Sequence, residues 1–407
     1  MGRYSWFLLA VLVSFCACNN SLIKEVATSP SGGWLGKLHL SGGHYVPFNF
    51  SIEDSILVIS NSTERIPVDI LVEDSLRCHL PVFGSDLVFK VVNHHEIRGF
   101  WHNGQDRNKS IVFSATRQPL GNNRFNHSSV EPSKHFQGKW KTTFSVNNNA
   151  YPAIGIFEQN HNVVTGTFLT ETGDYRYLEG NAIGDSLFLS CFDGAHAFLF
   201  AAEQIGDSLC GIFRSGKNYI DSCWVAVKND SVELSNPDSL SYILANEPPF
   251  SFSFPGINTK SVDYSKGAFL GKPVIIQLFG SWCPNCADEC RFLSQLYNEY
   301  HDEGLEVLGL AFEKTQPSQK QKNRLISYID ALDIPYPVGI AGNSSKSDAS
   351  KMFPQISAIT SFPTCVFIDK AGRVARVHTG FYGPGTGPYY NKYVKNTRLF
   401  IQELLVK

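Results

Sequence analysis

The pattern of apolar and polar positions changes once along the chain, close to residue 256. Before residue 228, short runs that alternate between apolar and polar residues are broken by Gly, Asn and Asp, for example ILVIS, DLVFKVV and SLFLSC. This alternation of period two is typical of strands with one buried face, and no convincing helical period interrupts it. After residue 256, continuous apolar runs such as VIIQLF alternate with amphipathic stretches. The pattern predicts an all-β region followed by an α/β domain.

The all-β region contains a repeat of itself. The stretch Trp34-Leu-Gly-Lys resembles Phe136-Gln-Gly-Lys139, and four further pairs of stretches match in the same order at a nearly constant spacing. An ordered repeat of this kind predicts two units of similar topology. The sequence leaves open whether each unit is a small sandwich or a barrel, or whether both share one.

The amino-terminal residues have the composition of an export signal. Arg3 precedes an apolar run from Trp6 to Ala17, which is too short to span a bilayer comfortably and has the length of a signal-peptide core. The run ends in Phe-Cys-Ala-Cys, which resembles a bacterial lipobox although Phe15 stands where Leu is usual. The resemblance implies lipidation of Cys18, with Cys16 as a rival, and an uncleaved anchor or a plain secretory signal as alternatives. Every version predicts export to a compartment where disulfides can form, and the lipidated version predicts a protein of the cell envelope that faces the periplasm.

The predicted fold class is therefore multidomain, with two tandem all-β units followed by an α/β domain. The second linker contains one possible short helix, at Pro237–Ala245. The predicted segments are a lipoprotein signal peptide (1–18), a tether (19–33), the first β unit (34–118), a linker (119–135), the second β unit (136–228), a linker (229–255) and the α/β domain (256–407).

Composition and charge narrow the function classes. Apolar residues make up 43% and charged residues 18% of the chain, as in an ordinary folded protein. A net charge of −2 without a basic run argues against a nucleic-acid partner. Ten cysteines in 407 residues are too few for a disulfide-stapled scaffold, so their local spacing matters more than their number.

The candidate chemistry lies in Trp282-Cys283-Pro284-Asn285-Cys286, between the apolar run VIIQLF and a predicted helix. Unpaired backbone N–H groups and the helix dipole stabilise an anion at a helix N-terminus, which favours a thiolate on the first cysteine. Proline suits the first helical position, where its missing N–H costs nothing. A second thiol three positions later can close a disulfide, so the pair has the parts needed for thiol–disulfide exchange.

Together with Ser361-Phe-Pro-Thr364 before a later strand, this motif resembles the thioredoxin fold, and residues 250–407 resemble its TlpA/ResA group of envelope thiol–disulfide oxidoreductases. The resemblance implies a cis Pro363 facing the sulfurs. It also matches Glu289, three residues after the second cysteine, and a strand–helix insertion at roughly 305–340. Two departures are Gln277, where thioredoxin has a buried Asp, and Asn285, where a proline is usual.

The resemblance implies an enzyme that exchanges a dithiol or disulfide with protein or peptide substrates. Cys283 would attack, Cys286 would resolve the mixed disulfide, Glu289 would tune or relay a proton, and Pro363 would shape the substrate groove. The expected groove residues are Trp282, Pro284, Phe362 and Thr364. No cofactor is expected, and the expected partners are a membrane or periplasmic electron donor and the membrane itself, through the lipid anchor.

These cysteines have three alternative interpretations: a structural disulfide, a copper site and a peroxidase. A structural Cys283–Cys286 disulfide would close too small a loop to stabilise much. Copper binding by Cys286, Cys290 and His378 has a suitable spacing, but Cys290 lies on the inward stripe of the helix and is better explained as core packing. A peroxiredoxin-like peroxidase would need Pro and Thr ahead of Cys283, and neither stands at the required spacing.

Three further features of the sequence lie outside this motif. Cys210 and Cys223 flank a predicted turn and would form either a structural disulfide or two buried free thiols. The Gly-rich stretch 383–387 could line the face that carries the cysteine pair. The β units contain no catalytic constellation, so they are expected to be a binding module or a spacer.

Overall fold

The computed structural model describes residues 30–104, 110–119, 124–125, 130–146, 149–216, 222–245, 249–265, 269–314 and 318–406. Cys18 and the rest of the predicted signal lie outside the described residues. Within the described ranges, no helix has both the length and the apolar character required to cross a membrane.

The first β unit is a closed, antiparallel eight-stranded barrel in chain order. Phe48, Phe50 and Phe113 pack together in its core with ring centroids 5.7 to 6.0 Å apart. Its strands are β1 (Gly32–His39), β2 (Tyr45–Glu53), β3 (Ile56–Asn61), β4 (Glu64–Val72), β5 (Leu76–Leu80), β6 (Ser85–Asn93), β7 (Glu96–His102) and β8 (Ser110–Arg117).

The second β unit is also a ring of eight strands, closed by the pairing of β10 with β11. The short β12 is a ninth strand on the edge of β11. The strands are β9 (Gly138–Val146), β10 (Asn149–Asn160), β11 (Val163–Thr170), β12 (Gly173–Asp174), β13 (Leu178–Ile183), β14 (Ser186–Phe192), β15 (Ala197–Ile205), β16 (Ser208–Ser215) and β17 (Ser222–Lys228). The predicted tandem all-β units are confirmed, and the structure decides for two barrels.

The predicted repeat of two similar units is present, but its first pair of stretches is matched four residues out of register. Gly32 and Gly138 open their barrels with φ of 117° and 110°. Two residues later, Trp34 donates its Nε1–H to the carbonyl of Pro30 at 2.7 Å, and Trp140 donates to the carbonyl of Phe136 at the same distance. Trp140, not Phe136, is therefore the counterpart of Trp34. The stretch that ends at Lys139 resembles the one that begins at Trp34 only because an alternating pattern of apolar and polar residues matches itself at every even shift.

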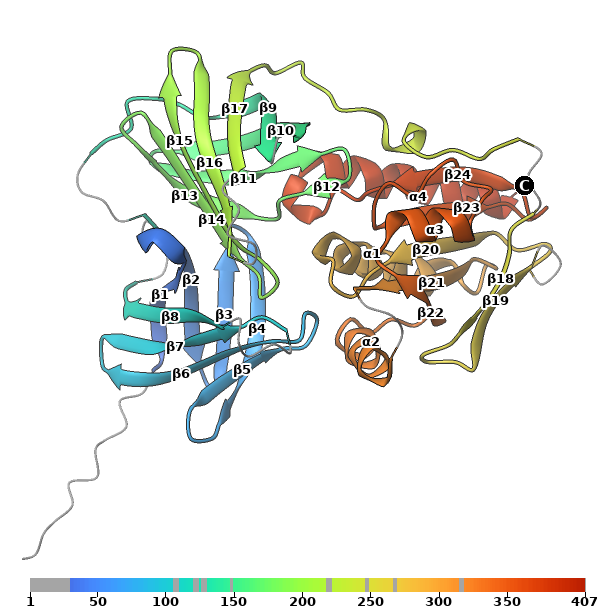
Figure 1. Cartoon of the computed structure of the whole chain (residues 1–407), viewed down its shortest axis with the longest axis horizontal. Helices are drawn as coiled ribbons and strands as arrows, with labels where there is room; N and C mark the ends of the chain where they lie inside the picture. Colours follow the sequence, from blue (N-terminus) through green and yellow to red (C-terminus); the bar gives the residue numbers. More distant parts are fainter. Residues whose placement is uncertain are drawn as a thin grey trace, which may run out of the picture.

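The two barrels pack directly on each other, with β14 against β2 and β3. Phe192 enters the core of the first barrel, 4.5 Å from Phe48 between ring centroids. The linker residue Arg124 is buried between the barrels, where it donates to the carbonyl oxygen of Ser190 at 3.1 Å and to the carboxylate of Glu179 at 3.1 Å. The barrels therefore form one body (Figure 1).

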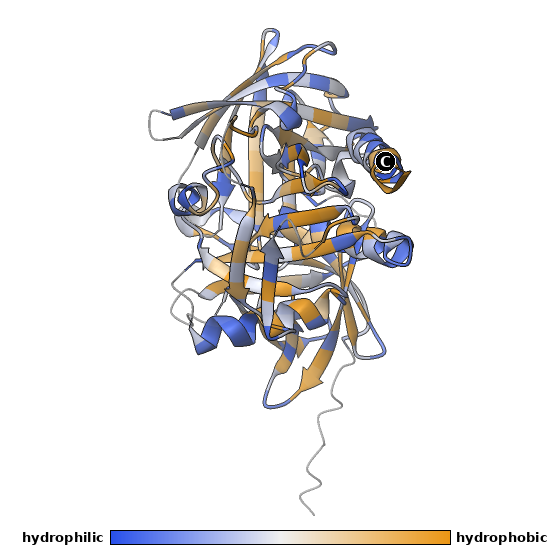
Figure 2. Cartoon of the chain, turned by 90° about the vertical axis from the view of Figure 1, so that its right-hand side faces the viewer, coloured by the Kyte–Doolittle hydropathy of each residue, from blue (hydrophilic) through white to orange (hydrophobic). Residues whose placement is uncertain are grey.

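The carboxyl-terminal domain has a five-stranded sheet in the order β22-β21-β20-β23-β24. The strands are β20 (Val274–Phe279), β21 (Glu306–Glu313), β22 (Val338–Asn343), β23 (Thr364–Ile368) and β24 (Val374–Thr379), and the helices are α1 (Pro284–Tyr300), α2 (Gln319–Ala331), α3 (Lys346–Met352) and α4 (Pro388–Val406). The central β20 is buried along its whole length, as its continuous apolar run predicts. In Figure 2 the hydrophobic colour follows the strands and the hydrophilic colour follows outer helix faces and turns.

Some local elements differ from the expectation. β18 (Ser251–Pro255) and β19 (Ser261–Ser265) form a hairpin, although 251–255 fell within the range assigned to the linker. Phe252 meets Phe353 edge-on at 6.0 Å, and Val262 and Tyr264 are buried in the core of the α/β domain, so this hairpin is part of that domain. The possible helix at Pro237–Ala245 is only the short 3₁₀ turn η3 (Pro237–Ser239).

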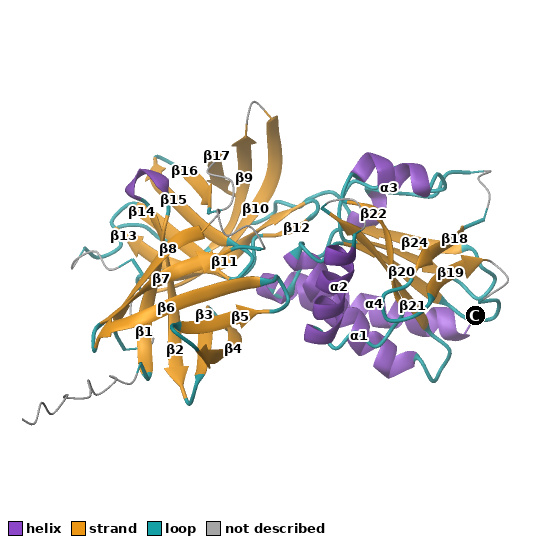
Figure 3. Ribbon diagram, turned by 60° about the horizontal axis from the view of Figure 1, so that its bottom comes forward, coloured by secondary structure: helices purple, strands orange, loops and turns teal. Residues whose placement is uncertain are grey.

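The α/β domain contacts both barrels with the side that carries α1 and α2 (Figures 1 and 3). The segment between β17 and β18 runs across the top of the molecule in Figure 1 and connects the second barrel to the far side of the sheet. The first barrel touches α2 through the β5–β6 turn, and the second barrel touches α1. This arrangement places the cysteine pair at a junction between domains.

Candidate active site

The cysteine pair lies where β20 ends and α1 begins. Cys283 is the N-cap of α1, and its Sγ accepts a hydrogen bond from the backbone N–H of Cys286 at 3.2 Å. Cys283 is 8% exposed, whereas Cys286 is completely buried, and both are free thiols. Burial raises the pKa of the Cys286 thiol well above its usual value, and the neighbouring Cys283 raises it further. The two sulfurs therefore differ as an attacking and a protected thiol would differ.

The loop before β23 forms the other side of the pair. The Phe362–Pro363 peptide bond is cis, and the carbonyl oxygen of Phe362 lies 3.6 Å from the Sγ of Cys283. The hydroxyl of Thr364 donates to the carbonyl of Ser361 at 2.9 Å and closes the loop on itself. Pro363 thus lies next to Cys283 in space, as the resemblance implies, and Thr364 supports the loop from a buried position.

Trp282 is held beside the pair by an adjacent strand end. Its Nε1–H donates to the carbonyl of Phe312 at 2.9 Å, and its ring meets Phe362 edge-on at 6.2 Å. The ammonium of Lys314 lies 5.7 Å from the centre of the indole ring, within the range of a cation–π contact. The indole therefore forms a fixed wall beside Cys283.

Glu289 is completely buried in α1, one turn beyond Cys286. Its Oε2 accepts a hydrogen bond from the amide of Gln277 at 2.8 Å. Burial raises the pKa of Glu289 to about 7, although the Gln277 amide opposes the shift. The carboxylate in turn adds to the effect of burial in raising the pKa of the Cys365 thiol. A group that titrates near neutral pH can give or take a proton under working conditions.

Gln277, where thioredoxin has a buried Asp, holds a polar cluster under the helix. Its Oε1 accepts hydrogen bonds from Cys290 at 3.2 Å and from the hydroxyl of Tyr336 at 3.4 Å. Burial raises the pKa of the Cys290 thiol to about 12. Cys290 is thus a protonated, hydrogen-bonded residue of the core, as the helical stripe predicts.

The structure separates the residues of the copper hypothesis. His378 contacts Asp238 at 2.5 Å through Nδ1 and packs at a tilt against Tyr393, with ring centroids 4.6 Å apart. Cys290 instead contacts Gln277 beneath α1. Among the described residues there is no group of three or more His, Cys, Asp or Glu side chains arranged to hold a metal ion.

Asn285, the second departure from the family pattern, contacts the second barrel. Its Nδ2 donates to the carbonyl oxygens of Asp174, at 3.5 Å, and Phe381, at 3.4 Å. A Cβ on Gly173 would lie 1.9 Å from the same nitrogen. Asp174 also accepts a hydrogen bond from the backbone N–H of Gly383 at 2.7 Å, so the Gly-rich stretch contacts the barrel. The turn between β11 and β12 therefore lies directly on the cysteine motif.

One arginine joins all three domains beside this turn. Arg176 is almost completely buried and forms ion pairs with Glu64 of the first barrel at 2.8 Å and with Asp193 of the second at 3.2 Å. Its third partner is Asp288, two residues after Cys286 on α1. Sequence reasoning missed this cluster because its members are far apart in the chain and each resembles an ordinary surface charge.

A pocket of about 660 Å³ opens between the second barrel and the cysteine motif. Cys283 lines it together with Trp282, Pro284 and Phe362, so three of the four expected groove residues meet there. The fourth, Thr364, is buried behind them. The opposite wall comes from the mouth of the second barrel, which the sequence had not connected with the site.

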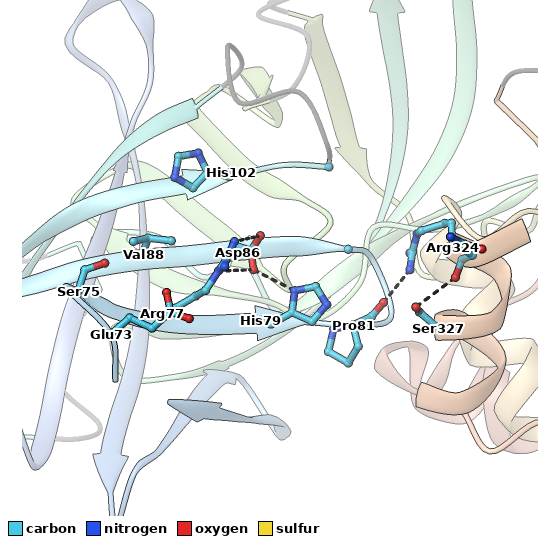
Figure 4. A pocket seen from close by; sticks show the side chains of 13 residues that line it. Glu73, Ser75, Arg77, His79, Pro81, Asp86, Val88, His102, Arg324 and Ser327 are labelled. Carbon is cyan, nitrogen blue, oxygen red and sulfur yellow. Dashed lines mark hydrogen bonds and ion pairs between the residues drawn. The ribbon is translucent and has the colours of Figure 1, made fainter. Parts of the chain in front are cut away.

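A second, more polar pocket of about 570 Å³ lies between the first barrel and α2 (Figure 4). Within it, Arg77 pairs with Asp86 at 3.2 Å. Arg324 of α2 donates to the carbonyls of Pro81, at 2.7 Å, and Ser281, at 3.3 Å. This contact ties the first barrel to the loop that leads into Cys283.

Cys210 and Cys223 do not face each other. Cys210 lies opposite Val225, and Cys223 lies opposite Ile212. Diagonal neighbours of this kind are about 7–8 Å apart, which is too far for a disulfide. Both are exposed free thiols, so neither the disulfide nor the pair of buried thiols is correct.

Comparison with known proteins places the carboxyl-terminal domain in a class. The Redoxin family model matches residues 245–391. The thiol-disulfide oxidoreductase ResA of Halalkalibacterium halodurans is 24% identical over 136 residues, 33% of this chain and 69% of the relative. ResA of Bacillus thuringiensis subsp. konkukian is 27% identical over 106 residues, 26% of this chain and 54% of the relative. The chain thus spans about half to two thirds of these relatives.

Two solved structures are similar to part of the chain. A thiol:disulfide interchange protein of the thioredoxin family from Chlorobium tepidum is 23% identical, covers 40% of this chain and 99% of its own, and has a TM-score of 0.30. The thioredoxin domain of a thiol-disulfide oxidoreductase from Bacteroides vulgatus is 17% identical, with coverages of 40% and 99% and a TM-score of 0.28.

The family match and the relatives confirm the predicted class. Residues 245–391 match the Redoxin family model, and the carboxyl-terminal part of the chain is thioredoxin-like and similar to the TlpA/ResA group of thiol–disulfide oxidoreductases. The α/β fold described above agrees with this class.

Proposed function

We propose that the protein is a thiol–disulfide oxidoreductase of the cell envelope that exchanges a dithiol or disulfide with protein or peptide substrates through Cys283 and Cys286. The observation that carries the proposal is the asymmetry of the pair. The Sγ of Cys283 caps α1 and opens to a pocket, whereas Cys286 is sealed beneath it. A reactive thiol that can be reached and a protected resolving thiol are the minimum for controlled exchange.

The reductive direction illustrates the chemistry. The Cys283 thiolate attacks one sulfur of a substrate disulfide, that bond breaks, and the departing substrate thiolate takes up a proton. Cys286 loses its proton and attacks the Sγ of Cys283, which releases the second substrate thiolate and leaves an enzyme disulfide. Two electrons pass from the enzyme dithiol to the substrate. Glu289 is the proposed proton acceptor for Cys286, since its pKa of about 7 suits this task.

The remaining assignments belong to the same proposal. Trp282, Pro284, Phe362 and Pro363 form the substrate groove, and Thr364 supports it. Lipidation of Cys18 would hold the protein at a membrane facing the periplasm, where an electron donor of the envelope would reduce or reoxidise the pair. The segment boundaries predicted from the sequence are kept, except that the hairpin from residue 251 joins the α/β domain.

A redox titration of the full chain tests the proposal. The protein is equilibrated in a dithiothreitol series, free thiols are alkylated, and the mass shift is measured. We expect a reversible two-electron transition that disappears in Cys283→Ser and in Cys286→Ser and persists in the matched control Cys290→Ser. A transition that survives Cys283→Ser would contradict the proposal.

A further inference from the structure

The pocket at Cys283 is built from two domains. The carboxyl-terminal domain supplies the reactive sulfur and the indole of Trp282, and the second barrel supplies the facing wall. The volume of about 660 Å³ is within the range of ligand-binding clefts and exceeds what a disulfide alone needs. The barrel side chains that matter for this wall are Tyr151, Tyr175, His196, Phe198, Phe213 and Ser215.

The barrel wall is aromatic and pre-formed. Tyr175 packs edge-on against Phe198 at 5.5 Å and against Phe213 at 5.2 Å. The ring of His196 stacks on Phe198 at 4.2 Å, and the hydroxyls of Tyr151 and Tyr175 are 2.7 Å apart. Interlocked rings of this kind keep their shape when a ligand binds, so binding costs little side-chain entropy.

The wall is also fixed relative to Cys283. The carbonyl oxygen of Asp174 in β12 accepts a hydrogen bond from Asn285, between the two cysteines, and the carboxylate of Asp174 accepts one from the backbone N–H of Gly383. A Cβ on Gly380 would lie 2.8 Å from the backbone of Thr172, so the two chains approach at backbone distance. The aromatic wall and the reactive sulfur therefore form one site.

The chemistry of the wall favours an uncharged occupant, because most of the wall is aromatic and its acidic members already have hydrogen-bond partners. Glu171, which also lines the pocket, accepts a hydrogen bond from the hydroxyl of Ser235 at 2.6 Å. The Asp174 carboxylate is occupied by the backbone N–H groups of Gly383 and Arg176, at 2.7 Å each. Lys314 lies against the indole of Trp282. A small charged disulfide such as glutathione disulfide would bring several ionised groups against aromatic rings and lose their hydration. A peptide can instead present one apolar side chain there.

We propose that the second barrel selects the substrate: its aromatic wall binds a large apolar side chain, best an aromatic one, that is adjacent to the reacting cysteine of a peptide segment. The inference rests on the proposed exchange function and names its substrate class. The bond changes are those described above, with the peptide disulfide as the electron acceptor and the enzyme dithiol as the donor. The second barrel is then part of the active site and not a spacer.

Two disulfide-linked peptide dimers test this selection with the full chain. One has the sequence Gly-Phe-Cys-Gly and the other Gly-Ser-Cys-Gly, both with blocked termini, and oxidised glutathione is the third probe. Reduced protein is mixed with each probe, quenched with acid and analysed by chromatography. We expect the Phe-containing dimer to react at least about tenfold faster than the Ser-containing dimer, and glutathione disulfide to be slower than the Phe-containing dimer.

A matched pair of variants tests whether this pocket causes the preference for the Phe-containing dimer. Ser215→Trp fills the pocket from the end of β16 and should lower the Phe-to-Ser rate ratio to about one. Ser208→Trp places the same side chain at the other end of the same strand and should keep the ratio. Should Ser215→Trp fail to fold by circular dichroism, Tyr151→Leu reduces the wall instead and should also lower the ratio.

The outcomes separate the two proposals. Equal rates for the two peptide dimers, a faster reaction of glutathione disulfide, or a ratio that the pocket variants leave unchanged would overturn the selection by the barrel while exchange itself stands. If the protein reduces none of the three probes, the proposed function fails and the selection fails with it.

Discussion

At the scale of single residues, burial sets the chemistry of the site. Cys286, Cys290 and Cys365 are all completely buried, and burial raises the pKa of each thiol. Glu289 is the one acid among them, and its carboxyl is shifted into the physiological range by the same cause. Burial therefore gives Glu289 a pKa at which it can take up a proton near neutral pH, when Cys286 must lose one.

Glu289 should make the protein less stable as the pH rises. Its pKa is about 7 in the folded protein and 4.5 in the unfolded chain, so its contribution is fully present below about pH 4.5 and is lost as the pH rises through 7, by up to about 3 kcal/mol. Glu289→Gln should remove this slope. The free energy of unfolding, measured in urea at pH 5 and pH 8, should fall less in the variant than in the parent.

The exposed Glu303 offers a matched control, because Glu303→Gln removes the same charge from a turn on the surface. It should leave the pH dependence of the parent intact. An identical slope in the parent and in Glu289→Gln would show that the carboxyl of Glu289 ionises freely in the folded state.

At the scale of elements, the turn between β11 and β12 and the start of α1 form one unit. Gly173 has a φ of 156° and leaves only enough space for the amide of Asn285. Asn285 occupies the second position of α1, between the two cysteines, and points its amide nitrogen at the turn. One of the two positions that depart from the family pattern, Asn285, therefore contacts the barrel.

Gly173→Ala should loosen this contact. Its methyl group would displace the amide of Asn285, in addition to a backbone cost of about 1 kcal/mol or more at positive φ. We expect faster alkylation of Cys283 by iodoacetamide, because the turn no longer covers it. Gly206→Ala is the control, with a φ of 61° and open space around the new methyl group. Equal alkylation rates for the two variants would refute the contact as a cover.

At the scale of the whole molecule, Arg176 links the three domains. It is paired with one carboxylate from each of them. Despite burial, His196 and Arg176 hold the pKa of Asp193 well below its usual range, whereas burial raises the pKa of Glu64 against the pull of Arg176. Removal of Arg176 should cost much of the free energy of unfolding, because several buried carboxylates would lose their counter-ion.

Arg176→Met should lower the free energy of unfolding by about 3–5 kcal/mol and separate the unfolding of the carboxyl-terminal domain from that of the barrels. Urea denaturation followed by circular dichroism and by alkylation of Cys286 checks both effects. Arg291→Met is the control, because Arg291 is 49% exposed and pairs only from the surface with Asp288. That variant should lose less than about 1 kcal/mol. Equal losses in both variants would contradict a buried role for Arg176.

The sequence alone was sufficient to predict the features that depend only on neighbouring residues along the chain. The capping cysteine, the proline after it and the second thiol lie within five consecutive residues, so their helix-terminal chemistry could be predicted without knowing the fold. The alternation of apolar and polar residues predicted the all-β region, because successive side chains of a strand point to opposite faces of the sheet.

Only the tertiary structure decided how these parts meet. Barrel closure depends on pairings between strands that are far apart in the chain, β1 with β8 and β9 with β17, which no local pattern encodes. Asn285 and Asp174 are 111 positions apart, and Arg176 and Asp288 are 112 apart, so neither contact leaves a mark on the neighbouring sequence. The sequence determined the reactive pair and the kinds of domain, since both depend on neighbours along the chain. The aromatic wall opposite Cys283 was decided by packing between domains, where the energy of each contact depends on residues that the chain brings together only after folding.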